Sequence, residues 1–432
     1  MKPAHVLAAL LLLAACADAP SPEGTFGPNP HLPPPAGGGL PTVNPATAVG
    51  WPDGAAPIAP EGFTVTRYAE GLAHPRWIYV LPNGDVLAAE SATRPQAGGG
   101  LMGWIRNSVQ RRAGAFHDNA DRITLLRDSD RDGDVDEQHV FAENLNQPFG
   151  MALVGGYFYV GNTDAVVRFP YAEGATRLEG AGETVLRLPY REGDNGHWTR
   201  NLLAAPDGSK IYVAVGSATN IADHGMEIEQ GRAAIWEMNP DGSDARVFAS
   251  GLRNPVGMDW APGAGALWTV VNERDMLGDN LVPDYMTSVQ DGAFYGWPYY
   301  YFGEHRDERV EIPANVRLQA PLAPDYALGA HTASLGLMFY RGEALPERYR
   351  GGAFIGQHGS WNRSVRVGYK VVFVPFADGR PSGDAQDFLT GFLNARGEAQ
   401  GRPVGVAMDR TGALLVADDV GNIVWRVAPN AP

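Results

Sequence analysis

Apolar and polar positions from about residue 60 onward follow one loosely repeated unit. Each copy starts with a small polar or proline-containing step and continues into an apolar strand. It then turns at Pro, Asp, Asn or Gly and enters a second apolar strand. Short apolar runs bounded by turn residues are typical of β-strands, and no long stretch has the period of a helix. The pattern therefore predicts an all-β fold.

Six copies of this unit can be recognised, and their first strands start near residues 75, 148, 199, 255, 334 and 403. The intervals between these starts are 73, 51, 56, 79 and 69 residues. A four-stranded propeller blade needs about 40 to 50 residues, so each interval holds one blade and an inserted loop. We therefore predict a six-bladed β-propeller of four-stranded antiparallel blades over residues 61–432.

Two extended apolar stretches lie outside the six copies, at residues 64–68 and 423–427. A ring of blades leaves no open sheet edge only if its first and last blades are joined. We predict that these two stretches pair in one blade and close the ring.

The N-terminus has the features of a targeting segment. Lys2 supplies a positive charge, residues 6–13 are apolar, and Leu13-Ala14-Ala15-Cys16 resembles the bacterial lipobox. The apolar stretch is too short to span a bilayer, so residues 1–15 are predicted to be a lipoprotein signal peptide, with Cys16 carrying the lipid. This implies an exported chain anchored on the periplasmic face of a bacterial membrane. An ordinary signal peptide that contains a cysteine is the alternative.

Cys16 is the single cysteine of the chain, so the exported body has no disulfide and its stability must come from packing. Residues 16–60 are rich in Pro, Gly and Ala, which predicts a tether between membrane and propeller. The formal net charge of −15 argues against a nucleic-acid partner, because nothing would offset phosphate repulsion.

Propellers carry their functional groups on loops around the central channel, and polar residues gather at the corresponding corners of this repeat. His197 precedes the third copy, Arg253-Asn254 open the fourth, and Asn272 to Asp275 end it. Other polar or aromatic corners are Tyr295 to Pro298, His358 to Arg363, and Arg402.

The runs Gly196-His197, Arg253-Asn254-Pro255 and Tyr295-Gly296-Trp297-Pro298, in this order and spacing, resemble the pyrroloquinoline quinone (PQQ)-dependent sugar dehydrogenases. That family includes soluble glucose, aldose, L-sorbosone and fungal pyranose dehydrogenases. The resemblance covers residues 62–427 and is closest to the sorbosone and pyranose branch. It implies a quinoprotein oxidoreductase that oxidises a sugar, a sorbosone-like aldehyde or a polyol.

The resemblance also implies roles for single residues. His197 would be the general base that removes the substrate hydroxyl proton. PQQ carries three carboxylates, which the arginine fork suits. The chain has Val404 where a second cofactor arginine is expected, so His358 or Arg363 would take up that charge. The implied cofactor residues are Arg200, Arg253, Asn254, His358, Arg363 and Arg402.

Calcium is the second cofactor that the resemblance implies, bound by the main-chain carbonyls of Arg274 and Asp275. Asp128, Asp130 and Asp132 form another calcium candidate, because carboxylates alternate there as in the first half of an EF-hand loop. His139 stands where that loop has a bidentate Glu, and a tight Asp/Gly hairpin turn explains the same residues without a metal.

Trp297 is a candidate for stacking on a sugar ring, although propeller blades also bury aromatic side chains. The chain has no Cys-x-x-Cys-His haem motif, so electrons would pass to a separate cytochrome c or membrane quinone. Two alternative functions remain from the sequence. One is a lactonase-type hydrolase with carboxylates around a channel metal, and the other is a non-catalytic surface propeller that binds a glycan or a protein.

Overall fold

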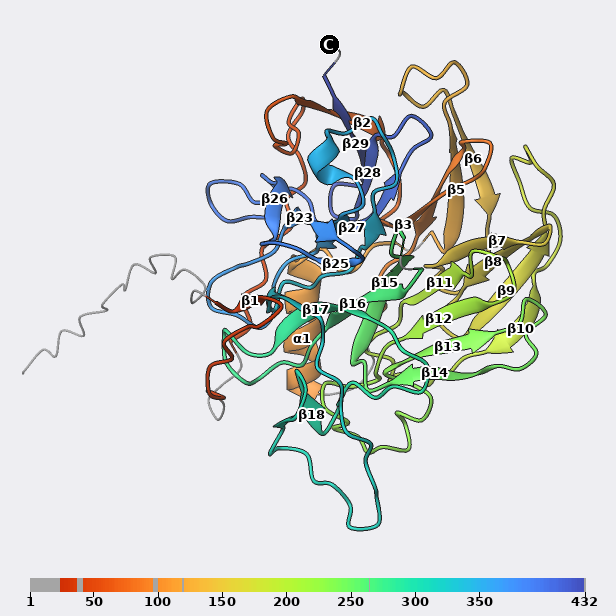
Figure 1. The fold of residues 1–432 in the computed structure, drawn as a ribbon. Helices are drawn as coiled ribbons and strands as arrows, with labels where there is room; N and C mark the ends of the chain where they lie inside the picture. The colour runs from red at the N-terminus through yellow and green to blue at the C-terminus, as the bar shows by residue number, and fades with distance from the viewer. Residues whose placement is uncertain (1–23, 37–41, 96–99, 119, 264, 431–432) are drawn as a thin grey trace, which may run out of the picture.

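The computed structural model describes residues 24–36, 42–95, 100–118, 120–263 and 265–430. Its strands form six antiparallel sheets arranged in a ring, which is a six-bladed β-propeller (Figure 1). This confirms the fold expected from the repeat. The predicted signal peptide and Cys16 lie outside the described residues.

Each blade begins with the first strand of one predicted copy. Blades 1 to 3 are β3 (Pro75–Val80), β4 (Val86–Glu90), β5 (Arg122–Arg127), β6 (Glu137–Ala142); β7 (Met151–Val154), β8 (Tyr157–Gly161), β9 (Ala165–Pro170), β10 (Glu183–Arg187); and β11 (Arg200–Ala204), β12 (Ile211–Val215), β13 (Ala234–Met238), β14 (Arg246–Ser250). Blades 4 to 6 are β15 (Asn254–Trp260), β16 (Leu267–Asn272), β17 (Pro283–Ser288), β20 (Tyr326–Ala330); β21 (Met338–Phe339), β22 (Ala353–Gln357), β23 (Lys370–Val374), β26 (Gln386–Leu389); and β27 (Pro403–Met408), β28 (Leu414–Asp418), β29 (Ile423–Pro429), β2 (Phe63–Ala69).

Blade 6 closes the ring with strands from both ends of the propeller. β2 pairs antiparallel with β29, and Val65 lies opposite Val427. The predicted pairing of these two stretches is therefore confirmed. Closure gives this sheet its fourth strand and leaves no gap between the first and last blades.

A glycine at the same point of several copies explains how tightly the blades meet. A Cβ added to Gly257 would lie 2.6 Å from Leu337 N in the next blade, and one added to Gly405 would lie 2.9 Å from Arg76 O. Gly150 makes the same kind of approach to the Leu202 backbone. The first strands of adjacent blades are therefore nearly in backbone contact, which places their starts together around the central axis.

The hydrophobic core lies between neighbouring blades. In one cluster Leu125 of blade 1 packs with Phe149 and Phe158 of blade 2, and the Phe141 and Phe158 rings meet edge to face at 5.2 Å. Burial of this kind in every blade interface supplies the stability that a chain without disulfides needs.

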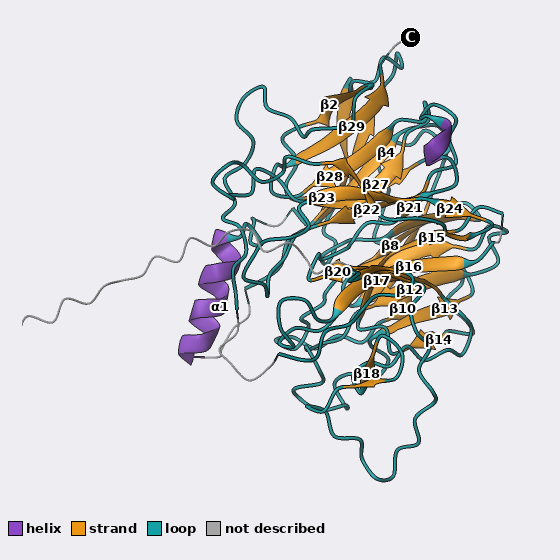
Figure 2. Ribbon diagram, turned by 60° about the vertical axis from the view of Figure 1, so that its left-hand side comes forward, coloured by secondary structure: helices purple, strands orange, loops and turns teal. Residues whose placement is uncertain are grey.

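Some elements go beyond the predicted four-stranded pattern. Helix α1 (Gly100–Arg112) lies in the insertion between β4 and β5, set apart from the sheets on one side of the propeller (Figure 2). Its sequence has no regular apolar face, so the pattern of the chain gave no sign of it. No helix in the described ranges is long and apolar enough to cross a bilayer.

Smaller additions are β1 (Phe26–Gly27), which joins blade 4 beside β20, and the two-stranded pairs β18 (Tyr300–Tyr301) with β19 (His305–Arg306) and β24 (Phe376–Ala377) with β25 (Arg380–Pro381). A single 3-10 turn spans Glu347–Tyr349.

The segment predicted as a tether makes contacts with the propeller where it is described. Ala46 is fully buried in the core cluster of blades 5 and 6. Trp51 packs edge to face on Trp425 of β29, with ring centroids 5.2 Å apart. We refer to residues 42–51 as the strap.

Candidate functional site

Two adjoining cavities lie where the blade corners meet. The small cavity has a volume of about 210 Å³ and the large cavity about 1010 Å³. Both are lined by Thr93, Gly196, His197 and Trp198, so His197 stands between them. The large cavity also contacts α1 through Arg106 and Gln110. Besides His197, the small cavity takes polar residues from four blades, namely His74, Arg76, Asn254, Asn272, His358, Arg402 and Asp419.

One buried carboxylate organises one side of the small cavity. Asp419 Oδ2 accepts a hydrogen bond of 2.8 Å from His358 Nε2, forms a close ion pair with Arg76, and lies 3.4 Å from His74 Nε2. Burial acts to raise the pKa of this carboxyl, but electrostatic interactions with His358, His74 and Arg76, together with the His358 hydrogen bond, hold it well below its usual range. Asp419 is therefore ionised and cancels one positive charge of the cavity.

The small cavity still contains two unpartnered donors and one unpartnered acceptor. The Nε atoms of Arg76 and Arg402 and Asn254 Oδ1 are buried and have no hydrogen-bond partner within the described chain. No carboxylate of the described residues pairs with Arg402, whose guanidinium instead lies 5.1 Å from the Tyr369 ring centroid. Two guanidinium groups facing one carboxylate suit an anionic ligand with several carboxylates.

The hydrogen bonds of His197 define its tautomer. Nδ1 lies 2.9 Å from Ser217 O and 3.0 Å from Ser217 Oγ. The Ser217 hydroxyl donates to Thr219 O at 2.7 Å, so both oxygens that face Nδ1 act as acceptors. The neutral ring therefore carries its proton on Nδ1, which leaves the lone pair of Nε2 as the basic site.

Electrostatics keep this ring neutral. Burial, followed by the positive charge of Arg253, lowers the pKa of His197 to about 3. The imidazole is then unprotonated over the whole physiological pH range, as a proton acceptor must be at the start of a reaction.

Arg200 supports His197 from behind and lines neither cavity. Its buried guanidinium donates to the carbonyl oxygens of His197 at 2.8 Å and Thr199 at 2.9 Å, and to Pro189 O and Asn195 Oδ1. Four such bonds fix the loop that carries His197. The structure thus places Arg200 as a support of the loop that carries His197.

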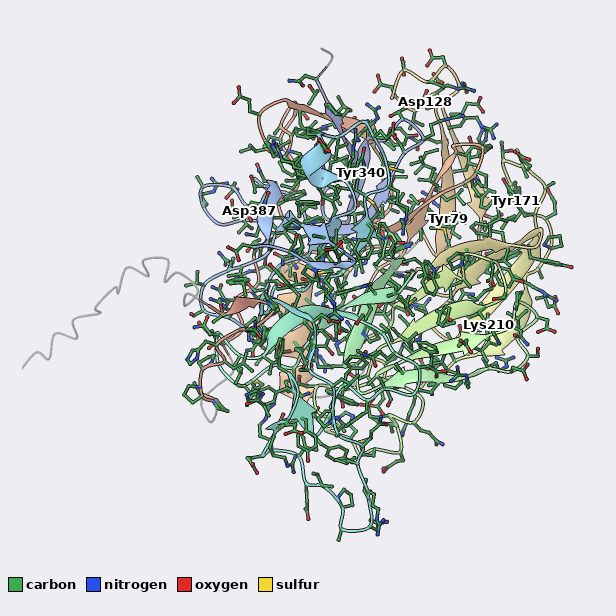
Figure 3. All side chains as sticks on the ribbon, in the orientation of Figure 1. Tyr79, Asp128, Tyr171, Lys210, Tyr340 and Asp387 are labelled. Atoms are coloured by element: carbon green, nitrogen blue, oxygen red, sulfur yellow. The ribbon has the colours of Figure 1, made fainter. Side chains whose placement is uncertain are left out.

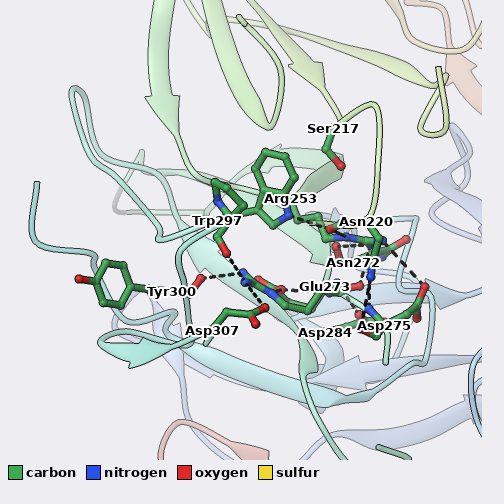
Figure 4. A network of polar contacts seen from close by, with 12 residues as sticks. Ser217, Asn220, Arg253, Asn272, Glu273, Asp275, Asp284, Trp297, Tyr300 and Asp307 are labelled. Atoms are coloured by element: carbon green, nitrogen blue, oxygen red, sulfur yellow. Dashed lines mark hydrogen bonds and ion pairs between the residues drawn. The ribbon is translucent and has the colours of Figure 1, made fainter. Parts of the chain in front are cut away.

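Arg253 and Trp297 share one network around Asn220 (Figure 4). Arg253 donates to Asn220 O at 3.0 Å, Asn220 Oδ1 at 2.9 Å and Glu273 O at 2.6 Å, and it lines the large cavity. Trp297 Nε1 also donates to Asn220 O, at 2.9 Å. Trp297 is buried and lines neither cavity. Its indole is therefore placed to hold Asn220, and no face is open for stacking on a sugar.

The two predicted calcium carbonyls lie beside this network. Asp275 O already accepts hydrogen bonds from Arg309 Nη1 at 3.0 Å and from Asn220 Nδ2 at 3.3 Å. The Arg274 side chain is fully buried and pairs with Glu273 and Asp307. The Asp275 carboxylate lines the large cavity and lies 3.3 Å from His331 Nδ1. Calcium at Asp275 O would have to displace the Arg309 bond.

Two other predicted residue sets lie elsewhere. Arg363 donates to Asp279 O at 2.6 Å and lines neither cavity. Asp128 lies at the outer tip of the β5–β6 hairpin (Figure 3). Its carboxylate and those of Asp130 and Asp136 approach within 4.8 Å, whereas Asp132 is not in this group. The same Asp128 oxygens accept hydrogen bonds from Arg131 N and Gly133 N, as in a tight turn.

His74, Arg76 and Asp419 are cavity residues that the sequence reasoning missed. A signal for two of them was present, because His74-Pro75-Arg76 opens the first copy at the position where Asn254-Pro255 and Arg402-Pro403 open others. Asp419 follows the second strand of the sixth copy, as Glu273 follows that of the fourth. Comparing equivalent corners of all copies would have identified His74, Arg76 and Asp419.

The buried histidines predict an acid-sensitive fold. Burial lowers the pKa of His74 and of His358 to about 4 from 6.5, so between these values the unfolded chain binds protons that the folded chain does not. The free energy of unfolding of the unloaded chain should therefore fall from pH 7 to pH 5, by about 2 kcal/mol for each histidine. Urea unfolding at both pH values measures this.

His197, whose pKa is lowered to about 3, adds to this fall. Asp284 and Asp418 oppose it, because burial raises the pKa of each carboxyl to about 6. His331 also opposes it. Burial tends to lower its pKa, but the hydrogen bond and charge of Asp275 outweigh burial and raise it. The His139→Asn variant, at a partly exposed position of β6, should keep the pH dependence, and His358→Asn should lose part of it. Stability that is constant or higher at pH 5 would contradict the expectation.

Known proteins with a similar chain or fold were found. An uncharacterised protein of Borreliella burgdorferi is 29% identical over 302 residues, which cover 67% of this chain and 77% of that protein. The calcium structure of a Trichoderma reesei carbohydrate-active enzyme of family AA12 matches with a TM-score of 0.68 and 18% identity, over 90% of this chain and 100% of that one. The holo form of the pyranose dehydrogenase PQQ domain from Coprinopsis cinerea matches with a TM-score of 0.66 and 20% identity, over 86% and 97%.

At these identities the likeness to solved structures establishes a shared propeller fold. Residues 60–418 match the family described as "Domain of unknown function (DUF7133)", which accounts for nearly the whole propeller. The chain therefore belongs to the DUF7133 family.

Proposed function

We propose that this chain is a PQQ-dependent oxidoreductase that oxidises a hydroxyl group of a sugar or related polyol. The observation that carries the proposal is the position of His197. A neutral imidazole with a basic Nε2 lines both a small, arginine-lined cavity and a large cavity open to substrate. The PQQ domain of pyranose dehydrogenase, which has the same fold, adds support.

The small cavity is proposed to hold the quinone. Arg76 and Arg402 would pair with its carboxylates, because both have buried nitrogen atoms without partners. Asn254 would add a hydrogen bond at the same wall. When bound there, PQQ supplies the acceptor for hydride from the substrate carbon.

His197 would remove the hydroxyl proton of the substrate. Its Nε2 is the unprotonated nitrogen, and Ser217 keeps Nδ1 turned away as a donor. Arg200 holds the backbone of this loop, so the ring meets the substrate without first reorganising. Arg253 beside it raises the positive charge that would favour a developing alkoxide.

Calcium stays part of the proposal at the carbonyl oxygens of Arg274 and Asp275. The Asp275 carboxylate, which lines the large cavity next to these carbonyls, offers a further oxygen. Oxygen donors of this kind suit a hard cation. Activity should then depend on added calcium after treatment with a chelator.

The arrangement of side chains favours this function over the hydrolase. Across the described ranges, the one group of three acidic or histidine side chains close enough to bind a metal together is Asp128, Asp130 and Asp136, which lies at the tip of the β5–β6 hairpin. A lactonase-type centre would instead need such a group inside a cavity. A purely binding propeller would have no need for the arginines of the small cavity.

The test is to express residues 17–432, which keep β1 on blade 4, and titrate PQQ with calcium by calorimetry, then to assay dye reduction with aldoses, sorbosone and polyols. Saturable binding near one quinone per chain and turnover of at least one sugar are expected. Absence of quinone binding at saturating calcium would overturn the proposal. The same assay, with cytochrome c or a quinone in place of the dye, tests whether a separate molecule of either kind accepts the electrons.

Export and lipidation at Cys16 remain a prediction. If Cys16 carries a lipid, the full chain expressed in a bacterium should partition into the detergent phase of a Triton X-114 extract. The Cys16→Ser variant should move to the aqueous phase, because two or more acyl chains provide stable anchoring. Equal partitioning of both proteins would rule out the lipid anchor.

A further inference from the structure

We propose that the strap, residues 42–51, is a functional part of the small cavity. It orients Arg402 and supports the cavity wall below α1, where the quinone would bind. This inference rests on the proposed function. It assigns to the N-terminal segment, which the sequence suggested was only a tether, a role in ligand affinity.

The strap starts against the loop that follows His358. Asn44 N donates to Trp361 O at 3.1 Å, and Asn44 Nδ2 donates to Ser364 O at 2.8 Å. Arg366 Nη2 in turn donates to Asn44 Oδ1 at 2.8 Å. These contacts join residues more than 300 positions apart, and they fix the strap over blade 5.

Arg402 takes its side-chain orientation from the strap. Its Nη2 donates to Ala46 O at 3.2 Å, while Ala46 N donates to the Tyr369 hydroxyl at 3.0 Å. The Tyr369 ring lies against the same guanidinium. Because no carboxylate of the described chain pairs with Arg402, these contacts are what hold it in place. They also leave its Nε free toward a ligand.

The middle of the strap backs the wall under α1. Ala48 N donates to Arg112 O, the last residue of α1, at 2.9 Å. A Cβ added to Gly114, which lines the small cavity, would lie 2.8 Å from Ala48 Cβ. On its other side the strap exchanges backbone hydrogen bonds with Ala399 through Thr47 O and Val49 N. The strap therefore fills the space between α1 and blade 6.

Trp51 anchors the end of the strap. Its Nε1 donates to Asp418 Oδ2 at 2.6 Å, and Asp418 Oδ1 accepts from Arg402 N at 2.7 Å. A Cβ on Gly401 would lie only 2.6 Å from this Nε1. The Asp418 carboxylate therefore links the strap to the main chain of Arg402. The residue after it, Asp419, pairs with Arg76.

A pre-oriented arginine binds an anion more tightly than a mobile one, because less side-chain freedom is lost on binding. Loosening the strap should therefore weaken quinone binding through Arg402. The Trp51→Phe variant removes the Nε1 hydrogen bond and keeps an aromatic ring against Phe392 and Trp425. We expect a loss of about tenfold in PQQ affinity.

The experiment is a double-mutant cycle on residues 17–432 with PQQ affinity from calorimetry. Trp51→Phe is measured alone and in the Arg402→Ala background, where it should have little further effect. Trp260→Phe is the matched control, because Trp260 Nε1 at the end of β15 makes a similar 2.8 Å bond to Ala204 O of blade 3. If Trp51→Phe is poorly folded, Asn44→Ala releases the other end of the strap.

Hydrogen exchange of the unloaded chain gives a readout that does not need the quinone. Trp51→Phe should speed exchange of the Arg402 amide and of residues 113–115, and Trp260→Phe should not. If Trp51→Phe leaves both affinity and exchange unchanged while the wild type binds PQQ, the strap proposal is wrong. If the wild type binds no PQQ, the proposed function fails. Unaltered hydrogen exchange in Trp51→Phe would then also refute the role of the strap in positioning Arg402.

Discussion

Replacing His197 with alanine is expected to lower kcat for sugar oxidation by about 10²–10⁴-fold, which is the usual contribution of a general base. The variant should bind PQQ with nearly wild-type affinity, because the expected quinone contacts are made by Arg76 and Arg402. Dye reduction under saturating substrate, paired with calorimetric titration of PQQ, separates the two effects.

His139→Ala serves as the control, since His139 is partly exposed on β6 and lines neither cavity. A pKa of about 3 for His197 also implies that kcat/KM has no acid limb near pH 6.5 and stays level down to about pH 5. Wild-type turnover in His197→Ala would show that another group is the base.

Replacing Arg402 with alanine should reduce PQQ affinity by at least about 30-fold, because truncating one member of a buried charge pair costs about 2–5 kcal/mol. The fold should survive, since the Arg402 amide keeps its bond to Asp418. The Kd from calorimetry and the melting temperature of the unloaded chain check the two parts of this expectation.

Arg341→Ala is the matched control, because Arg341 is half exposed and pairs with Asp259 far from the cavities. Arg402→Lys should recover only part of the affinity, since an ammonium cannot form two parallel bonds to a carboxylate. An Arg402→Ala variant with unchanged PQQ affinity would move the quinone out of the small cavity.

The buried charges explain why the cavity stays polar without a ligand. Asp419 compensates Arg76 directly, and the nearby His74 and His358 remain neutral because burial lowers the pKa of each. A second carboxylate there would remove the excess positive charge that an anionic cofactor needs. The small cavity therefore keeps an excess of positive charge, which an anionic ligand would balance.

The sequence by itself determined the architecture. Short strands separated by turn residues are local features, and their repetition along the chain indicated the number of blades. The closing pair of β2 and β29 followed from the need to leave no open edge. The positions of His197, Arg253, Asn254, His358 and Arg402 at cavity walls also agree with their corners in the repeat.

Only the tertiary structure decided what each polar residue contacts. Asp419 meets Arg76 across 343 positions, and the strap meets Arg402 across a similar separation, so neither pairing leaves a periodic trace in the chain. Arg200 and Trp297 occupy corners like those of the cavity residues, yet their side chains turn to backbone carbonyls instead. A corner position in the repeat fixes where the backbone of a residue lies. The direction of its side chain depends on neighbours that ring closure brings together from both ends of the sequence.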